Sequence, residues 1–489
     1  MNRDNGKHDF SSFLSPFTWR YGSAPMRAIW SEQNKRTIWR RIWVALARAQ
    51  HSVGIVSAEQ LQDIEAHADN FDIDRSLAIE VDIRHDLMAE LKCFAEQCPI
   101  GGRVIHLGAT SLDVEDNAEV IRIQAALDHV LNNLEGLLAR LAQLISSQAA
   151  VPANGFSHLQ PAEPVTVGFR LAQYGQDMMV DLDTLRKLRA DLRGKGIRGA
   201  VGTAASFVDL LAATGKEADH GQAISAFERM EQIAMSDLGL EAVPIANQTY
   251  PRKQDLILLN GLSGLGQSLY RFAFDLRLLQ SPGWGEWFEP AGTAQVSSSA
   301  MPSKRNPVDA ETICSLARFL SAMPGIAWNN AAHALFERTL DDAANRNEIL
   351  PCAFLATDEI LLRARRIFDG IEFNDVRIAA NLQQFSAFAA AERVLMAGTI
   401  KGADRQALHE ALRRHCMAAW EAVRSGKPNP LSELIVGDRF ITSFVSADAV
   451  RGLIDVGNYV GIASKHALTI AAKINETLNK AATGSRPGE

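Results

Sequence analysis

One long segment without proline decides the fold. Residues 113–150 have the sequence DVEDNAEVIRIQAALDHVLNNLEGLLARLAQLISSQAA, with Gly136 as the only glycine. Apolar residues recur in it with spacings of four and three, namely Leu127, Leu131, Leu134, Leu138, Leu141 and Ile145. This heptad-like seam is typical of a helix that packs lengthwise against other helices at a shallow angle. At 1.5 Å per residue the helix would be roughly 55 Å long.

Four more segments show helical spacing of apolar residues: about 164–192, 253–280, a helix starting near 307, and 350–368. Helices of this length cannot bury their seams within a small globule, so they predict a helical bundle that associates with other copies of the chain. A structural coiled coil is the alternative. The glycine-, serine- and proline-containing loops between the helices favour the bundle, because a rod would not need them.

The flanks of the chain contain shorter amphipathic helices, for example at about 36–53 and 57–67, and β-type alternation is scarce. We therefore predict an all-α protein with three domains. These are an N-terminal helical domain (1–111), a central bundle of very long helices (112–365) and a C-terminal helical domain (366–489).

The composition excludes several classes of protein. The 489 residues include 50 Lys+Arg and 57 Asp+Glu, a net charge of −7, which gives no reason to expect a nucleic-acid or membrane partner. No run of 18 uncharged apolar residues occurs, and the polar start lacks the apolar core of a secretory signal. The odd number of cysteines suits reduced thiols and a cytoplasmic location; they are Cys93, Cys98, Cys314, Cys352 and Cys416.

Several motifs that suggest cofactors can be set aside. The GLSGLG sequence at 261–266 has the wrong spacing for a dinucleotide fingerprint and lies within a helical seam, so it predicts close helix packing. His409 and His415 are six residues apart and do not form a metal-binding HExxH motif. We find no zinc, nucleotide-triphosphate or flavin signature, and we expect neither a metal nor a cofactor.

Three polar clusters lie at boundaries of the long helices: residues 103–117, 154–168 and 292–307. Helix ends offer unpaired amides that suit anionic ligands. Brought together by a bundle, the three clusters would form a polar pocket. The third cluster belongs to a long loop of small residues, from about Ser281 to Ser303, that could close over this pocket as a lid.

The third cluster also carries a family signature. Residues 297–307, SSSAMPSKRNP, resemble the signature of the fumarase/aspartase superfamily. Within that superfamily the chain is most similar to the eukaryotic-type branch of the adenylosuccinate lyases. The similar blocks follow the same order: WRYGSAPMRAIWSE, IRHDLMAE, HLGATSLDVEDN, GFSHLQPAEP, GTAASF, NQTYPRKQD, the signature itself, and FERTLDDAANR.

The resemblance implies a cofactor-independent β-elimination that releases fumarate from an N-succinyl group, as part of purine biosynthesis. It implies that Ser298 is the general base, activated in the closed loop, and that His158 is the general acid for the leaving nitrogen. Lys304 and Asn306 would bind the reacting carboxylate, whose developing charge needs cationic and amide donors. His85 would orient the substrate and support the acid.

The resemblance also implies the remaining contacts with the substrate. Thr110, Ser111 and Gln248 would hold the succinyl carboxylates, whereas Arg20, Tyr21 and Arg338 would meet the nucleotide, chiefly its phosphate. Further substrate-binding residues implied by the matching blocks are Arg84, Asp86, Ser299 and Met301. In the family four chains form a tetramer, and each active site takes clusters from three chains. We therefore expect a homotetramer.

The chain departs from the family pattern at four positions. Ser297 replaces the glycine that precedes the two serines of the signature, and its Cβ would restrict the backbone of the loop. Ala343, Asn347 and Thr312 stand where the pattern has a serine and two arginines that contact the nucleotide. Such losses weaken a phosphate site by roughly a few kcal/mol.

Three hypotheses follow. The first is an adenylosuccinate lyase that also acts on the related succinylated imidazole-carboxamide ribotide. The second is a relative that releases fumarate from a smaller or non-phosphorylated succinyl substrate. The third is a binding or scaffold protein without activity, which the presence of Ser298, Lys304, Asn306 and His158 argues against.

Overall fold

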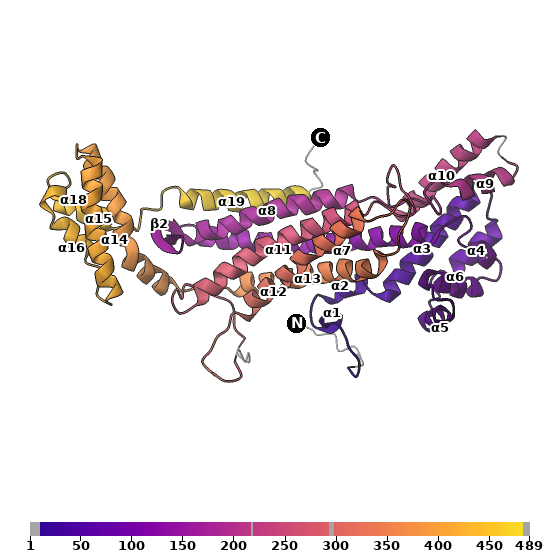
Figure 1. The fold of residues 1–489 in the computed structure, drawn as a ribbon, viewed down its shortest axis with the longest axis horizontal. Coiled ribbons are helices and arrows are strands. Elements are labelled where there is room, and N and C mark those ends of the chain that lie inside the picture. The colour runs from indigo at the N-terminus through magenta and orange to yellow at the C-terminus, as the bar shows by residue number, and fades with distance from the viewer. Residues whose placement is uncertain (1–9, 217–218, 293–297, 483–489) are drawn as a thin grey trace. The chain divides into compact units, whose positions relative to one another are not determined.

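The protein is mainly helical in the computed structural model, which describes residues 10–216, 219–292 and 298–482 (Figure 1). Helices hold 69% of the residues, and the strands of the described chain form two small two-stranded sheets. The predicted all-α class is therefore confirmed. No helix within these residues is long and apolar enough to cross a membrane, and all five cysteines are free thiols.

Five long helices run alongside one another: α7 (Ser111–Ser147), α8 (Val167–Asp191), α11 (Lys253–Gln280), α12 (Val308–Ala332) and α13 (Ala343–Gly370) (Figure 1). They match the five segments with helical spacing, and α11 has the predicted bounds. The seam residues from Leu127 to Ile145 are all buried, so packing of the apolar stripe stabilises α7 along its length.

The glycines of 261–266 are packing residues. A Cβ at Gly261 would lie 2.4 Å from the Leu188 side chain of α8, and a Cβ at Gly266 would lie 3.0 Å from the Leu320 side chain of α12. A side chain at either position would force the facing leucine to move, so the glycines allow this close packing. The expectation that this motif serves helix packing is confirmed.

The chain falls into two compact units, and each long helix contributes residues to both units. The first unit comprises residues 1–133, 181–267 and 316–362. Its shorter elements are α1 (Pro16–Trp19), α2 (Ala24–Ile29), α3 (Glu32–Ser52), α4 (Ala58–His67), α5 (Ile73–Ile83), α6 (Asp86–Gln97), the 3₁₀ turn η1 (Gly102–Val104), α9 (Ala205–Ala213) and α10 (His220–Leu238). The predicted boundaries of three domains, at 111 and 365, stay a prediction.

The second unit comprises residues 134–180, 268–315 and 363–489. Its other elements are β1 (Pro152–Ser157), β2 (Gln160–Thr166), β3 (Trp287–Phe288), β4 (Glu372–Phe373), α14 (Asp375–Ile400), α15 (Arg405–Arg424), α16 (Leu431–Val436), α17 (Arg439–Thr442), α18 (Ala447–Ile454) and α19 (Ala463–Ala482). Helices α14 to α18 surround an apolar core that includes Val394, Leu408, Leu431, Ile441 and Val450.

One segment differs from the sequence-based expectation. Helix α8 begins at Val167, not at Pro164, because residues 160–166 form the second strand of an antiparallel hairpin with β1. Pro164 pairs in register with Asn154 in this hairpin. The second polar cluster therefore lies on a β-hairpin before the helix.

Candidate active site

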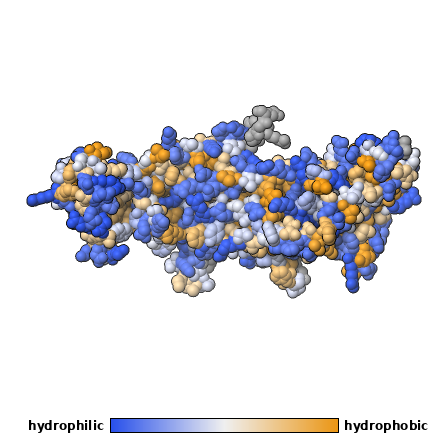
Figure 2. Space-filling model, turned by 45° about the horizontal axis from the view of Figure 1, so that its top comes forward, coloured by the Kyte–Doolittle hydropathy of each residue, from blue (hydrophilic) through white to orange (hydrophobic). Residues whose placement is uncertain are grey.

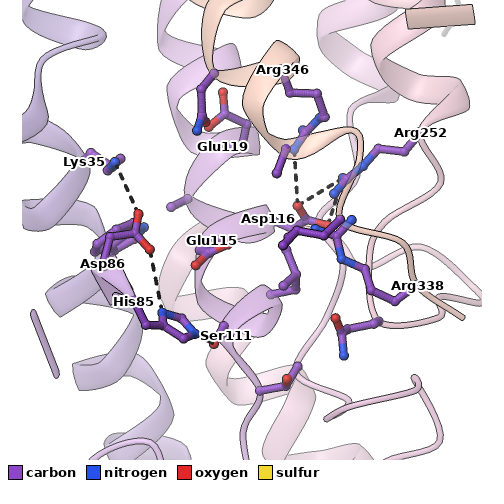
Figure 3. A pocket seen from close by; sticks show the side chains of 18 of the residues that line it. Lys35, His85, Asp86, Ser111, Glu115, Asp116, Glu119, Arg252, Arg338 and Arg346 are labelled. Carbon is purple, nitrogen blue, oxygen red and sulfur yellow. Dashed lines mark hydrogen bonds and ion pairs between the residues drawn. The ribbon is translucent and has the colours of Figure 1, made fainter. Parts of the chain in front are cut away.

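The first unit contains a cavity of about 660 Å³ where several helix ends meet (Figure 3). Its wall comes from the end of α5 and the start of α6, the first turns of α7, the segment before α11, and residues 338–347. The lining includes seven residues predicted as site residues: Arg84, His85, Asp86, Thr110, Ser111, Gln248 and Arg338. Four separate blocks of the sequence thus meet in one cavity.

The start of α7 is fixed by acceptors in its own sequence. The carboxylate of Asp113 accepts hydrogen bonds from the backbone N–H groups of Thr110 (2.9 Å), Arg198 (2.9 Å) and Gly199 (3.0 Å), and from the buried Lys195 ammonium. One turn later, Asn117 accepts from the Lys195 N–H at 2.8 Å. These contacts hold Thr110 at the cavity wall.

His85 lies between two helices and faces Ser111. It is the N-cap of α6 and follows Arg84, which ends α5 in the left-handed region with φ +55°. Its Nε2 lies 3.3 Å from the Ser111 Oγ, and its Nδ1 lies 3.7 Å from the carboxylate of Asp86. Asp86 in turn lies 3.8 Å from the Lys35 ammonium (Figure 3). The imidazole therefore has both an orienting carboxylate and a hydroxyl within reach.

Buried arginine–aspartate pairs form the wall of the cavity opposite His85. Arg252 donates to both oxygens of Asp116 at 3.0 Å and to Asp342 at 2.6 Å. Arg338 also donates to Asp342, at 2.7 Å. Burial raises the pKa of the Asp342 carboxyl and Arg252 lowers it, with a net result below its ordinary value. These arginines are thus already matched by carboxylates of the protein.

Arg346 belongs to the same wall. Its Nε donates to Asp255 at 2.7 Å and its Nη2 donates to the Tyr250 hydroxyl at 2.7 Å. Ala343 and Asn347 line the cavity beside it. Thr312 does not line the cavity; its hydroxyl donates to the Val308 carbonyl within α12.

Glu115 is a cavity residue that the sequence-based prediction missed. It is half-buried on α7 and lines the cavity. Burial, together with the charges of Asp86 and Asp116, raises the pKa of its carboxyl to about 7, against the opposing effect of Lys35 and Arg338. Its position within the TSLDVEDN block was a signal that it could face the site.

The signature loop lies in the second unit. The Ser298 Oγ accepts hydrogen bonds from the backbone N–H groups of Ala300 (3.3 Å) and Met301 (3.0 Å). Donors of this kind stabilise an alkoxide relative to a hydroxyl. Ser299, Met301 and Lys304 are exposed and Asn306 is half-buried, whereas Ser297 lies outside the described residues.

The base of this loop is clamped from two sides. Glu289, where the loop begins, accepts from the N–H groups of Asp309 (3.1 Å) and Ala310 (3.0 Å), at the start of α12. Gln280 accepts from the Glu289 N–H at 3.0 Å and donates to the Arg305 carbonyl at 3.3 Å. Both ends of the loop are therefore tied to the same framework.

His158 lies at the exposed tip of the β1–β2 hairpin, also in the second unit. His158 and Leu159 form the two-residue turn with φ values of +54° and +58°. Left-handed conformations cost roughly 1–2 kcal/mol per non-glycine residue, and hairpin turns of this type favour Asn-Gly. Strain of this kind often marks a functional site.

The cavity lining does not include Ser298, Ser299, Met301, Lys304, Asn306 or His158, nor Arg20 and Tyr21 of the first unit. Arg20 ends α1, and its guanidinium carbon lies 4.5 Å from the centre of the Trp19 ring. The next residues are tied to α13, because the N–H groups of Gly22 and Ser23 donate to Glu359 and Asp358.

Comparisons with known proteins cover most of the chain. Residues 20–319 match a family model described as "Lyase", and residues 387–467 match one described as "Adenylosuccinate lyase C-terminus". An adenylosuccinate lyase of Schistosoma mansoni is 36% identical over 437 residues, which is 88% of this chain and 89% of the relative. An adenylosuccinate lyase of Saccharomyces cerevisiae is 34% identical over 459 residues, covering 93% of this chain and 92% of the relative.

Solved structures share the fold. A fumarate lyase from Mesorhizobium sp. BNC1 has a TM-score of 0.80 at 23% identity, covering 94% of this chain and 99% of that chain. A 3-carboxy-cis,cis-muconate lactonizing enzyme from Pseudomonas putida has a TM-score of 0.80 at 25% identity, covering 93% and 98% of the two chains. The long-helix architecture is thus common to enzymes named for different activities.

Proposed function

The chain belongs to the adenylosuccinate lyase family of lyases, and from this premise we propose that it releases fumarate from adenylosuccinate and from the related succinylated imidazole-carboxamide ribotide. The cavity supports this function most directly. It gathers Thr110, Ser111 and Gln248, which the family pattern assigns to the succinyl carboxylates, and His85, to which it assigns orientation of the substrate.

In the proposed reaction, Ser298 removes the proton from the carbon next to a succinyl carboxylate. The electron pair forms the C=C bond of fumarate while the C–N bond breaks, and His158 gives its proton to the leaving nitrogen. The two amide donors on the Ser298 Oγ support its role, because they favour the alkoxide. Lys304 and Asn306 would stabilise the dianion that forms on the carboxylate.

A second candidate function keeps this chemistry but changes the leaving group. Arg252, Arg338 and Arg346 are each paired with an aspartate. Their positive charges are therefore partly neutralised and would attract a phosphate less strongly. Ala343 and Asn347 add neither a hydroxyl nor a cation to the cavity wall. These observations favour a non-phosphorylated or smaller succinyl substrate as the alternative.

A spectrophotometric assay separates the two candidates. Purified full-length protein is mixed with adenylosuccinate, and ultraviolet absorbance follows the loss of substrate. We expect turnover without added metal or cofactor. Absence of turnover at micromolar enzyme would reject adenylosuccinate as the substrate, and fumarate release from another N-succinyl compound would then support the second candidate.

We also propose that the protein is a cytoplasmic homotetramer with shared active sites. Large apolar side chains on α12 support association, since Phe319, Ile326 and Trp328 are 46%, 39% and 57% exposed. The face drawn in Figure 2 likewise carries apolar patches among polar surface. The five free thiols suit a reducing compartment.

Light scattering at micromolar concentration tests the assembly. We expect the mass of four chains, and a monomer would contradict the proposal. If sites are shared, mixing inactive Ser298→Ala and inactive His158→Ala proteins under conditions that exchange subunits should restore part of the activity. Each protein incubated with itself is the control, and mixtures no more active than these controls would reject shared sites.

A further inference from the structure

Glu115 differs from the carboxylates around it. It lies on α7 and faces the cavity between the His85 side and the Arg338 side (Figure 3). Within the described part of the chain its carboxylate has neither a hydrogen bond nor an ion pair. A half-buried carboxyl without a partner in an open cavity is available to a ligand.

Three acidic residues near Glu115 each have a cationic partner. Asp116 is held by Arg252 at 3.0 Å. Glu119, one turn further along α7, pairs with Arg122 at 3.3 Å. Asp86 lies 3.8 Å from the Lys35 ammonium. Lys35, Arg252, Arg338 and Arg346 are therefore each paired with a carboxylate other than Glu115.

The protonation state of Glu115 decides the charge of the wall. The cavity lining holds five basic residues (Lys35, Arg84, Arg252, Arg338 and Arg346) and five acidic ones (Glu80, Asp86, Glu115, Asp116 and Glu119), besides His85. Asp342 and Asp255, outside the lining, pair with Arg252, Arg338 and Arg346, so protonation of Glu115 makes the wall one charge less negative. Burial and two adjacent carboxylates favour the neutral form up to about pH 7, the value to which they raise its pKa.

We propose that neutral Glu115 donates a hydrogen bond to an oxyanion of the substrate, and that ionisation of Glu115 weakens substrate binding. The inference rests on the proposed function in one respect, namely that the substrate is anionic. The oxyanion can be a carboxylate of the succinyl group or a phosphate oxygen of the nucleotide. In either case Glu115 is a specificity-determining residue, because its charge sets which anions the cavity accepts and at what pH.

The test measures binding without turnover. Fumarate and AMP are titrated separately into full-length protein by calorimetry between pH 7 and pH 9, where a phosphate monoester, with a second pKa near about 6, stays dianionic. For the ligand whose oxyanion meets Glu115, the affinity of the wild-type protein should fall by up to about tenfold per pH unit, since one proton is linked to binding. Loss of affinity for AMP alone identifies the phosphate, and loss for fumarate alone identifies the carboxylate.

Two variants separate charge from hydrogen bonding. Glu115→Gln keeps a donor and cannot ionise, so it should bind about as tightly as wild type at pH 7 and keep that affinity at pH 9. Glu115→Ala should also lack the pH dependence but bind more weakly at pH 7. The matched control is Glu119→Gln, on the same helix and paired with Arg122, which should keep the wild-type pH dependence. Thermal unfolding monitored by circular dichroism checks that each variant is folded.

Other charged groups that face Glu115 are common to all these proteins: Lys35 on α3, Glu80 and Arg84 at the end of α5, His85 and Asp86 at the start of α6, Asp116 on α7, and Arg252, Arg338 and Arg346 across the cavity. Their titration therefore cancels in the comparison.

An affinity of Glu115→Gln that falls with pH as steeply as that of wild type would overturn the proposal, as would absence of binding of both ligands to wild type at pH 7. Failure of the proposed function gives a different result, namely binding without fumarate release.

Discussion

Replacement of Ser298 by alanine should lower kcat for fumarate release by about 10²- to 10⁴-fold, the usual contribution of a positioned general base. The variant loses the oxygen that accepts two backbone N–H groups in the signature loop. Because this residue is only half-buried and the base of the loop is clamped by Glu289 and Gln280, the fold should be retained. Steady-state kinetics with adenylosuccinate measure the effect.

The comparison of kcat with binding makes this test specific. A residue that acts only in the transition state lowers kcat and kcat/KM together, so the affinity of Ser298→Ala for AMP and fumarate should stay near that of wild type. Ser303→Ala, an exposed serine of the same loop, is the matched control and should keep its activity. If Ser298→Ala turns over at the wild-type rate, another group is the base.

The helical architecture was predictable because it follows from one-dimensional spacing. A seam with steps of four and three extends from Leu258 to Leu279, and α11 (Lys253–Gln280) contains the whole of that pattern. The β1–β2 hairpin was missed for an equally physical reason. Its turn is made by His158 and Leu159 in left-handed conformations, residues that carry no turn signal in a sequence.

The cavity was predictable in part. Arg84, Thr110, Gln248 and Arg338 come from four separate segments and line one cavity, as the family blocks implied. The pairs that Arg252 forms with Asp116 and Asp342 were not predictable, because they join residues 136 and 90 positions apart. Spacing reveals contacts within one helix or strand, whereas such ion pairs depend on how the helices are packed.

The absence of a partner for Glu115 also depends on how the helices are packed. Its sequence neighbours Asp113 and Asp116 look equivalent to it, and three-dimensional packing alone gives them Lys195 and Arg252 as partners. A carboxylate within this block therefore has a structural or a ligand-facing role according to which cations reach it. Sequence patterns cannot make this distinction.

Replacement of Lys195 by methionine should lower the free energy of unfolding by about 3–5 kcal/mol, the cost of removing one partner from a buried ion pair. Lys195 and Asp113 are both 0% exposed. The variant would leave the Asp113 carboxylate buried without its cation, although backbone N–H groups still donate to it. The site should suffer as well, since Asp113 holds Thr110 at the cavity wall.

Denaturant titration at one fixed protein concentration measures this loss, because unfolding of an oligomer depends on concentration. Lys187→Met is the matched control: Lys187 forms an exposed pair with Asp191, at 2.6 Å, one turn along α8, and such pairs contribute about 0.3–0.5 kcal/mol. Adding Asp113→Asn to Lys195→Met should recover part of the stability, since the unpaired charge is then removed. Equal stabilities of Lys195→Met and Lys187→Met would show that the buried pair does not hold the start of α7.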